Sequence, residues 1–418
     1  MGTRLRIALY HNLPSGGAKR SLFETVRRLG QSNQIDLFAP STADEIFCSI
    51  LPYVHRSNIV PFSTGLRLRK PFGRLNNIFL LEDIARLRRL LQLFAEKINN
   101  GDYDVVLDHP SQWTQAPDLL RYLQLPSVYY CHEPLRRLYE TDWIKKTVNQ
   151  TTKQILISKL DPLPRIVDGY VRRIDFEAAR SSTTIVTNSK FTAGEIKYVY
   201  GKEASVAYHG VDTEIFRPLG LKRENFVLSV GALLPHKGYD FVIRSLSRIP
   251  VNLRPPLIIV SNATSAVEHS RLQSLASEYE VVVDYYSQIS VSDLVDLYNR
   301  CSLVIYMPYR EPFGLVPLEA MACGTAVVAA REGGPGESVV DGQTGILVEH
   351  DEQKCAVVVM NLLLDGFLRE RLGEQGINYV RTYWTWDKAV ERMEKILYES
   401  IRSFASQPLY SFDHDEAS

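Results

Sequence analysis

Short runs of apolar and β-branched residues alternate along this chain with longer stretches in which apolar side chains recur at helical spacing. Near-continuous apolar runs of this kind are typical of parallel strands that are covered by helices on both faces. Helices are expected between the runs, for example over residues 292–298 and 318–323. The strands are predicted at residues 5–10, 34–39, 105–108, 127–131, 184–187, 205–208, 226–230, 257–261, 281–284, 303–307, 326–329 and 346–348.

The whole series of strands and helices occurs twice, which predicts an α/β protein with two doubly wound, Rossmann-like domains. The pattern breaks at Gly210, Pro218 and Gly220, so we place a hinge at residues 209–223 between domains at 1–208 and 224–385. A charged amphipathic helix is expected over 386–402, followed by a disordered tail at 403–418. Ligands of open parallel sheets bind beyond the carboxyl ends of the strands, so we expect the functional cleft between the two domains.

The two halves of the sequence carry opposite net charges, although the whole chain is neutral. The 418 residues carry 48 basic and 48 acidic side chains, but residues 1–208 hold 29 basic and 20 acidic ones, a net charge of +9. The rest holds 19 and 28, a net charge of −9. A basic first half favours an anionic partner on that side, whereas chance variation between two solvated domains is the alternative. No feature points to nucleic acid.

The number of cysteines and the hydropathy of the chain indicate the cellular compartment in which the protein is expected. Five cysteines, an odd number without any C-x-x-C pair, suit a reducing environment better than disulfides or a zinc site. The first ten residues lack the apolar core of a signal peptide, and no apolar run reaches the roughly 18 residues of a spanning helix. We therefore expect a cytoplasmic protein whose membrane contact, if any, is peripheral.

Two candidate sites lie in the first half. Gly16 and Gly17 follow the first strand and precede a helix expected from about Arg20, so backbone amides there could approach an anion closely. A plain tight turn would explain the same two glycines. His132 stands at the carboxyl end of the strand at 127–131, where its imidazole could donate to a sugar hydroxyl or take up a proton. A histidine satisfied within a loop is the alternative.

Two further candidates lie in the second half. Lys237 is predicted near the start of a helix, where a cation is unfavourable unless an anion binds there; a solvated surface lysine is the alternative. Glu311 and Glu319 flank a run in which Pro317 can occupy the first helical turn. The amides of residues 313–316 would then face an anion, and two carboxylates beside them suit recognition of sugar or ribose hydroxyls. Helix capping would explain one of the glutamates but not both.

Taken together, these motifs resemble the retaining glycosyltransferases of the GT-B fold, in particular the nucleotide-sugar-dependent family four. The spacing of Glu311 and Glu319, with seven residues between them, is similar to that family's signature. The resemblance covers most of the chain and is weakest between Ser41 and Asp102. Its other motifs are Gly16-Gly17-Ala18, Thr187-Asn-Ser-Lys-Phe191, His209-Gly-Val-Asp212, His236-Lys237-Gly238, Gly333-Gly-Pro-Gly-Glu337 and Asp341-Gly-Gln-Thr-Gly345.

The resemblance implies roles for individual residues. Glu319 would bind the ribose of the donor nucleotide, Glu311 the hydroxyls of the transferred sugar, and Lys237 the diphosphate leaving group. His132 would contact the donor sugar, and the final helix would cross back to brace the first domain. The main chain at 288–289 would meet the base. The implied catalytic residues are His132, Glu311 and Lys237, and the implied donor-binding residues are Gly16, Gly17, Lys237, Ile289, Glu311, Phe313, Gly314, Leu315 and Glu319.

One departure concerns the diphosphate. The family usually has an arginine at the position of Ala232, and its loss removes a charge-assisted contact that Lys19 or Arg331 would have to replace. No cofactor or metal is expected, because Asp102-Tyr-Asp104 precedes its strand, unlike the acidic motif of metal-dependent enzymes. No second carboxylate stands out for a double displacement, so the resemblance implies transfer on one face of the sugar.

The resemblance is strongest to mannosyltransferases, which implies GDP-mannose as donor, with UDP-glucose, UDP-N-acetylglucosamine and UDP-galactose as alternatives. A glycan or lipid-linked saccharide would be the acceptor. Basic residues at 67–70, 74 and 86–89 could meet an anionic membrane surface, although solvated helix faces explain them equally well. From other classes, a sugar-nucleotide epimerase and a non-catalytic binding protein remain open.

Overall fold

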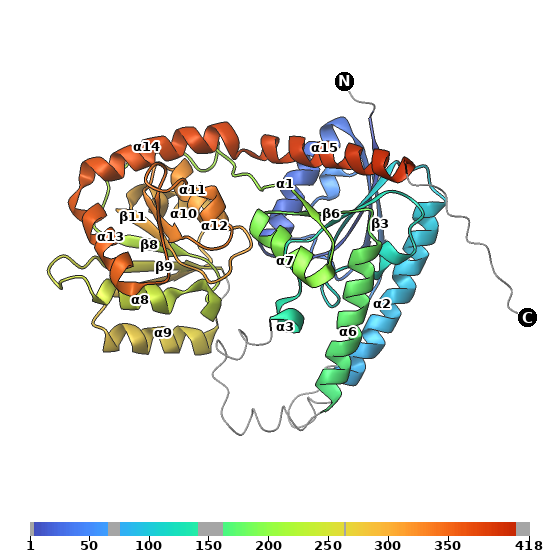
Figure 1. Ribbon diagram of the computed structural model, residues 1–418, viewed down its shortest axis with the longest axis horizontal. Helices are drawn as coiled ribbons and strands as arrows, with labels where there is room; N and C mark the ends of the chain where they lie inside the picture. The colour runs from blue at the N-terminus through green and yellow to red at the C-terminus, as the bar shows by residue number, and fades with distance from the viewer. Residues whose placement is uncertain (1–3, 66–75, 141–161, 263–264, 407–418) are drawn as a thin grey trace, which may run out of the picture.

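Two parallel β-sheets, each lying between layers of helices, stand side by side in the computed structural model (Figure 1). The structure describes residues 4–65, 76–140, 162–262 and 265–406. The first sheet has seven strands in the order β3-β2-β1-β4-β5-β6-β7, and the second has six in the order β10-β9-β8-β11-β12-β13. Two doubly wound, Rossmann-like domains are therefore confirmed.

The first sheet is built from the strands predicted in the first half and one more. The additional strand, β3, lies at the sheet edge, and most of its residues are exposed or half-buried, so it lacks the apolar run of a central strand. The strands are β1 (Arg6–Asn12), β2 (Gln34–Pro40), β3 (Arg56–Val60), β4 (Val105–Ser111), β5 (Ser127–Tyr130), β6 (Thr184–Thr187) and β7 (Ala204–Val206). The helices are α1 (Gly17–Ser32), α2 (Asn76–Asn99), α3 (Arg136–Tyr139), α6 (Pro162–Ser181) and α7 (Lys190–Tyr200), with single 3-10 turns at η1 (Leu51–Tyr53) and η3 (Asp118–Arg121).

The second sheet follows the prediction closely. Its strands are β8 (Val227–Val230), β9 (Leu257–Ser261), β10 (Val283–Ser287), β11 (Leu303–Tyr306), β12 (Val327–Ala330) and β13 (Ile346–Val348). The helices around it are α8 (Tyr239–Ser247), α9 (Ala266–Glu278), α10 (Val291–Arg300), α11 (Leu315–Ala322), α12 (Pro335–Ser338), α13 (Glu352–Leu364) and α14 (Gly366–Tyr383), with a 3-10 turn η4 (Pro235–Lys237).

The apolar strands of the second sheet supply two separate cores. Leu303 and Ile305 of β11 pack on one face of the sheet, whereas Val304 and Tyr306 pack on the other. This alternation follows from the two-residue period of a strand, and both faces are buried because helices cover both. Because helices cover both faces of the sheet, ligands can bind beyond the carboxyl ends of its strands.

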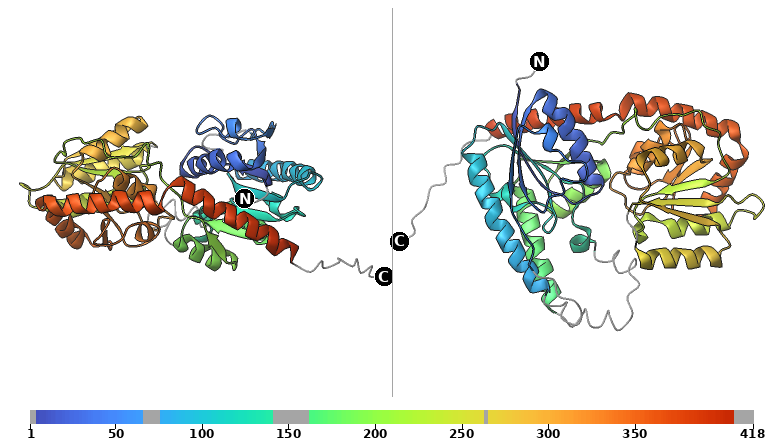
Figure 2. Two further views of the ribbon diagram at one scale, coloured as in Figure 1. Left: turned by 90° about the horizontal axis from the view of Figure 1, so that it is seen from above. Right: turned by 180° about the vertical axis from the view of Figure 1, so that it is seen from behind.

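The last two helices, α14 and α15 (Trp386–Ala405), run along one side of both sheets (Figures 1 and 2). Helix α15 packs on α1 of the first domain. The chain passes between the domains at two adjacent places, and Val211 N donates to Trp384 O over 2.7 Å. A methyl group at Gly210 would lie 2.3 Å from Trp386 N, so glycine is required for this close approach.

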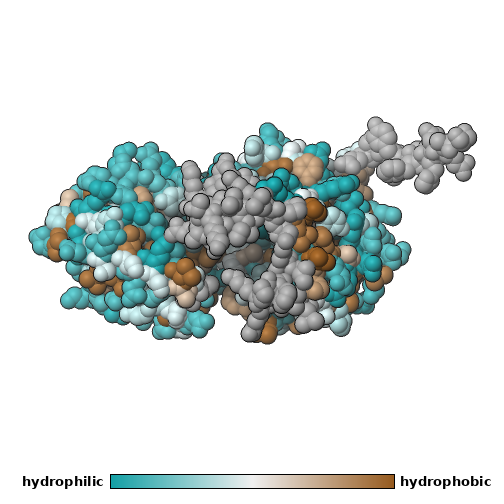
Figure 3. Space-filling view, turned by 90° about the horizontal axis from the view of Figure 1, so that it is seen from below, coloured by the Kyte–Doolittle hydropathy of each residue, from teal (hydrophilic) through white to brown (hydrophobic). Residues whose placement is uncertain are grey.

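Helices α2 and α6 lie side by side and extend beyond the first sheet (Figures 1 and 2). Near their ends Ile78 and Ile166 are 50% and 60% exposed, and Figure 3 shows apolar side chains on this side of the molecule beside the grey segments. Among the helices that the structure describes, none has the length and hydropathy needed to span a membrane. The basic residues at 67–70 and 74 lie outside the described residues, and Arg86 and Arg88 form ion pairs with Asp83 and Asp118.

Candidate active site

The predicted site residues all lie beyond the carboxyl ends of strands, on the side of each sheet that faces the other domain. Gly16 and Gly17 follow β1 and His132 follows β5 in the first sheet. Lys237 follows β8 and Glu311 follows β11 in the second. Both pairs of strands are central in their sheets. The parallel topology is therefore what brings these distant residues to one region.

Lys237 and Glu311 form an ion pair, with 2.8 Å between Nζ and Oε2. Both side chains are largely buried, so Lys237 is not a solvated surface lysine. Burial raises the pKa of the Glu311 carboxyl, but the charges of Lys237 and Arg136 outweigh burial and lower the pKa below its ordinary value. Lys237 thus has an anionic partner at the position where a cation alone would be unfavourable.

The loop after Glu311 leads into α11, whose N-terminus has no side-chain cap. Its N-cap residue, Gly314, has φ +82°, and a Cβ there would lie 2.9 Å from the ring of Tyr306. Pro317 is the third residue of the helix, as the sequence predicts, and has no amide to leave unpaired. Phe313 and Leu315 flank Gly314, so this run presents a helix N-terminus with backbone amides available to an anion.

Glu319 lies one turn further along α11 and is 4% exposed. The Tyr298 hydroxyl donates to its Oε2 over 2.9 Å, and Arg20 of the first domain donates to its Oε1 over 3.0 Å. Glu311 and Glu319 are therefore both held by hydrogen bonds from charged or phenolic groups. The contact of Arg20 with Glu319 joins the two domains directly.

The glycine pair at Gly333 and Gly334 packs under the Glu311 loop. A Cβ at Gly333 would lie 2.5 Å from Glu311 O, and one at Gly334 would lie 2.2 Å from the Cα of Phe313. Gly334 N also donates to Glu311 O over 2.8 Å. These glycines allow the backbone of the turn that follows β12 to support the loop that carries Glu311.

Gly16 and Gly17 have different surroundings. Gly16 has φ +146° and ψ −172°, a conformation that favours glycine, and it forms the N-cap of α1 without a side-chain hydrogen bond. A Cβ built at either glycine would meet no atom of the described residues within 4 Å. The helix begins at Gly17 rather than near Arg20, so its first amides lie at the glycine pair itself.

His132 lies in a cluster of aromatic rings at the carboxyl ends of β4 and β5. Its ring centroid is 4.6 Å from that of Tyr130, 5.6 Å from that of His109 and 5.8 Å from that of His209. Burial lowers the pKa of His132 to about 3, and its Nε2 has no hydrogen-bond partner among the described residues. A neutral imidazole suits a hydrogen bond to a sugar hydroxyl better than uptake of a proton.

The two cations predicted to replace an arginine at Ala232 are engaged elsewhere. Lys19 is fully buried in an ion pair with Glu45, whose other contacts include His11 at 2.8 Å. Arg331 donates to Asp341 over 2.6 Å and to Leu347 O over 2.8 Å.

The structure instead brings Arg20 and Arg136 to the two glutamates. Arg136 donates from Nη2 to Arg310 O, beside Glu311, over 2.6 Å. Each arginine lies four residues after a predicted site residue, Gly16 or His132, near the start of the helix that follows the strand. This closeness in sequence is the signal that could have identified them.

Two of the sequence motifs bind each other across the domain boundary. Glu337, which follows the glycine pair of the second domain, accepts hydrogen bonds from the backbone N–H of Lys190 and Phe191 at 2.9 and 2.7 Å. These amides are at the N-terminus of α7, a helix of the first domain. Tyr208 also donates to Glu337 over 2.8 Å, and Ser189 donates to Pro312 O over 2.5 Å. A carboxylate of one domain thus caps a helix of the other.

The predicted base-binding segment follows β10. Gln288 has φ +55° and donates its N–H to Ser261 O over 3.1 Å, and Ile289 packs partly on the apolar core of the second domain. Within the described ranges, no group of three or more histidine, cysteine or acidic residues could hold a metal ion. Asp102 and Asp104 instead contact Arg6 near the start of β1.

Comparison with known families gives two adjacent matches. Residues 15–215 match the model of Glycosyltransferase Family 4, and residues 211–379 match that of Glycosyl transferases group 1. The two models together extend over both domains and the hinge.

Curated relatives are similar over part or most of the chain. An uncharacterized glycosyltransferase of Methanocaldococcus jannaschii is 30% identical over 54% of this chain and 61% of its own length. A D-inositol 3-phosphate glycosyltransferase of Acidothermus cellulolyticus is 33% identical over 57% and 59%. The chain thus spans about 60% of the length of these two relatives. A D-inositol 3-phosphate glycosyltransferase of Salinispora arenicola is 26% identical over 94% of this chain and 89% of its own.

Solved structures share the fold at lower identity. The sucrose-phosphate synthase of Thermosynechococcus elongatus has a TM-score of 0.72 at 19% identity, covering 96% of this chain and all of its own. The Anabaena protein HepE, solved in complex with UDP and glucose, has a TM-score of 0.67 at 18% identity over 95% of this chain and all of its own.

Proposed function

We infer from the GT-B fold of this chain, which is the fold of the group 1 and family 4 glycosyltransferases, that it transfers a hexosyl group from a nucleotide sugar to an acceptor hydroxyl. The observation that carries this proposal is the ion pair of Lys237 and Glu311 beside the uncapped N-terminus of α11. A cation, a carboxylate and free backbone amides are the groups that a sugar joined to a diphosphate requires.

The chemistry of glycosyl transfer explains the arrangement. When the bond between sugar and phosphate breaks, positive charge develops on the sugar and negative charge on the departing diphosphate. Under this proposal Lys237 and the amides of α11 stabilise the diphosphate, and so does the N-terminus of α1 at Gly16 and Gly17. Glu311, held ionised by Lys237, can accept hydrogen bonds from the transferred sugar, and Glu319 from the ribose.

We further propose that the anomeric configuration is retained and that no metal takes part. Lys237 and the two helix N-termini supply stabilisation of the leaving group without a cation from solution. A double displacement needs a carboxylate that can attack the sugar from its far face. Glu311 is instead paired with Lys237, which favours transfer on one face, with the leaving phosphate accepting the acceptor's proton.

The donor is proposed to be a UDP-sugar. Support comes from the similar fold of HepE, whose structure was solved in complex with UDP and glucose. GDP-mannose, which the motifs around His132 and Glu311 predict, has no such support and is the second donor to test.

The acceptor is proposed to be a glycan or a lipid-linked saccharide. Contact of the basic first half with an anionic membrane is a further part of the proposal, although Arg86 and Arg88 are engaged in ion pairs within the first domain. Flotation with anionic liposomes at increasing salt tests it, because exposed basic residues would bind at low salt only.

Thermal denaturation with UDP-glucose, UDP-N-acetylglucosamine and GDP-mannose tests the donor. A ligand at 100 times its Kd stabilises the folded state by about 2.7 kcal/mol, which gives a clear shift in Tm. Proton NMR of the product formed with the active donor then gives the anomeric configuration. An epimerase would convert the donor without an acceptor, and a binding protein would be stabilised without any turnover; either result contradicts transfer.

A further inference from the structure

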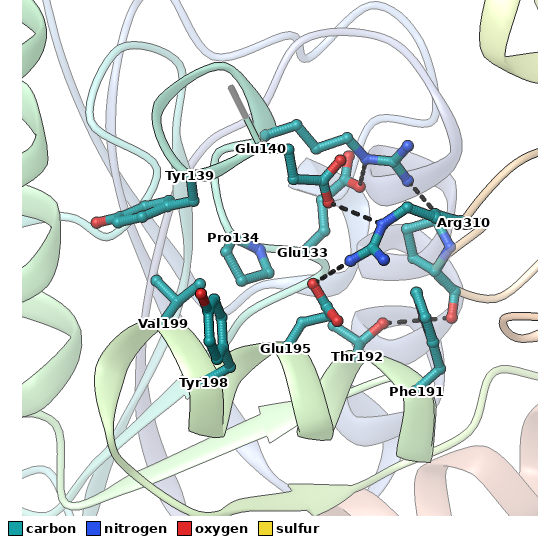
Figure 4. A pocket seen from close by; sticks show the side chains of 12 residues that line it. Glu133, Pro134, Tyr139, Glu140, Phe191, Thr192, Glu195, Tyr198, Val199 and Arg310 are labelled. Carbon is teal, nitrogen blue, oxygen red and sulfur yellow. Dashed lines mark hydrogen bonds and ion pairs between the residues drawn. The ribbon is translucent and has the colours of Figure 1, made fainter. Parts of the chain in front are cut away.

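A cavity lies between α3, α7 and the loop that carries Glu311, on the side of that loop toward the first domain (Figure 4). Its volume is about 90 Å³, roughly three times the volume of a water molecule in the liquid. It therefore has room for one edge of a sugar ring or its hydroxymethyl arm, but not for a nucleotide. None of the residues predicted from the sequence as donor-binding lines it.

The lining combines charged and aromatic side chains. Glu140 and Glu195 point toward the guanidinium of Arg310 (Figure 4), which donates to Glu195 over 2.5 Å and lies 3.4 Å from Glu140. Glu133 is directed at the other guanidinium of the lining, that of Arg136. Tyr198 borders the cavity and is 85% exposed, so one ring face is available for stacking. Carboxylates and guanidinium groups next to an exposed aromatic ring are well suited to bind a polyol, whose hydroxyls both donate and accept.

The charges exclude one class of ligand. Three carboxylates face two guanidinium groups, those of Arg136 and Arg310, so the lining is net negative. Arg136 is bound to Glu133 over 2.6 Å and Arg310 is bound to Glu195, so both cations are neutralised by the protein. A phosphate or carboxylate on the ligand would meet net repulsion here, whereas a neutral hydroxyl would not.

The lining has unused hydrogen-bonding capacity, because Arg310 Nε makes no hydrogen bond among the described residues and Glu140 offers a free acceptor. Glu140 Oε2 is buried and accepts no hydrogen bond from the residues that the structure describes. A buried carboxylate oxygen without a donor is unfavourable, and a ligand hydroxyl would satisfy it.

The cavity adjoins the proposed reaction centre. Arg310 and Pro312, the neighbours of Glu311, both line it, and so does Glu133, the neighbour of His132. Glu133 is close enough to Glu311 and Lys237 for their charges to affect its pKa, which burial raises. A molecule seated here would thus lie beside a sugar held by Glu311 and His132.

We propose that this cavity binds one edge of the acceptor, and that the acceptor is an uncharged saccharide or polyol at that edge. The proposal rests on the proposed glycosyl transfer and names the acceptor class for it. Glu140 accepts a hydrogen bond from an acceptor hydroxyl, and Tyr198 stacks on the ring beyond the cavity.

The test compares matched probes, myo-inositol and inositol 3-phosphate, together with methyl α-D-glucopyranoside. With the donor identified by thermal denaturation, kcat/KM for the two uncharged probes is expected to exceed that for the phosphate by about tenfold or more. A preference for the phosphate would overturn the proposal.

Two variants locate the binding. Glu140→Gln and Tyr198→Ala are each expected to raise the KM for the uncharged acceptor by roughly tenfold, the effect of losing a hydrogen bond to a charged group or a stacked ring. The KM for the donor should change by less than about twofold. Matched controls are Glu177→Gln, which alters a carboxylate of α6 paired with Arg173, and Tyr383→Ala, an exposed tyrosine of α14. An unchanged acceptor KM in both test variants contradicts the proposal.

Saturation-transfer NMR separates this proposal from that of the function. If wild-type protein gives myo-inositol signals that Tyr198→Ala abolishes, but no donor is turned over, the cavity proposal stands and glycosyl transfer fails. If a donor is turned over but the variants show neither loss of signal nor a rise in KM, glycosyl transfer stands and the cavity proposal fails.

Discussion

The two glycine pairs of this protein have the same sequence but opposite surroundings. Around Gly16 and Gly17 a Cβ would meet no described atom within 4 Å, whereas at Gly333 and Gly334 it would meet the backbone of the Glu311 loop at 2.5 and 2.2 Å. The first pair borders open space that a ligand could occupy, whereas the second pair allows the Glu311 loop to pack against its backbone. A glycine pair after a strand therefore indicates close approach, but only the structure tells whether a ligand or another loop approaches.

The largest expected effect is a loss of folding stability in Gly334→Ala. Its methyl group would overlap the backbone at Phe313, and the displaced loop would cost about 3 kcal/mol in the free energy of unfolding. Urea denaturation measures this cost. Gly194→Ala, in an open part of α7, is the control and should be neutral or slightly stabilising. Equal urea midpoints for Gly334→Ala and wild type would show that the second pair is not a packing requirement.

The next effect is a loss of activity when the charged residues at the loop supported by Gly333 and Gly334 are changed. Glu311→Gln and Lys237→Ala are each expected to lower kcat by about 100-fold, the size associated with single electrostatic groups in active sites. Steady-state kinetics with the donor found by thermal denaturation measures it. Lys354→Ala, which removes an exposed ion pair with Glu349, is the control. Near-normal rates in both folded variants would remove these residues from the site.

A smaller effect, on ligand affinity, is expected from Gly17→Ala, a substitution in the first glycine pair. Because nothing crowds this position, the free energy of unfolding should stay the same or rise by about 0.5 kcal/mol. The added methyl would narrow the space proposed for the diphosphate and weaken binding of UDP by about tenfold, as calorimetry can measure. Unchanged affinity for UDP would make the first pair a plain turn.

The smallest effect is a shift in acid stability. The lowered pKa of Glu311 contributes stability above its unfolded pKa, near 4.5, and that contribution is lost as the pH falls toward the folded pKa. In Lys237→Ala, burial dominates and raises the pKa of Glu311, so the variant is expected to be less stable than wild type at neutral pH, and this difference in the free energy of unfolding should shrink as the pH falls below about 4.5. Urea denaturation at several pH values measures the difference, with Lys354→Ala again as control. A difference that stays constant with pH contradicts the ion pair.

Much of the fold could be predicted because buried parallel strands have a strong local signature. The strands at Thr184–Thr187, Leu257–Ser261 and Ile346–Val348 have the bounds expected from their apolar runs. The edge strand Arg56–Val60 was missed because an exposed edge needs no such run. Helix α1 begins earlier than predicted because Gly17, without a Cβ, tolerates both turn and helix.

The candidate site was harder to predict because its contacts are long-range. The positions of Lys237, Glu311 and Glu319 follow from strand ends and helix starts, but their partners do not. Arg20 and Glu319 are 299 residues apart in sequence, and the charge of Lys19, next to the glycine pair, is taken up by Glu45. Which cation meets which carboxylate depends on how the two domains are packed, and no local pattern encodes it.

The final helix has a consequence for how the protein is made. Val390, Met393, Ile396 and Leu397 of α15 are buried in the same apolar cluster as the central strands of the first sheet. The first domain is synthesised before the second, but part of its core belongs to a helix that is synthesised after the second domain. We therefore expect the nascent first domain to keep an apolar face uncovered while the second domain is being translated, and to depend on chaperones during that interval.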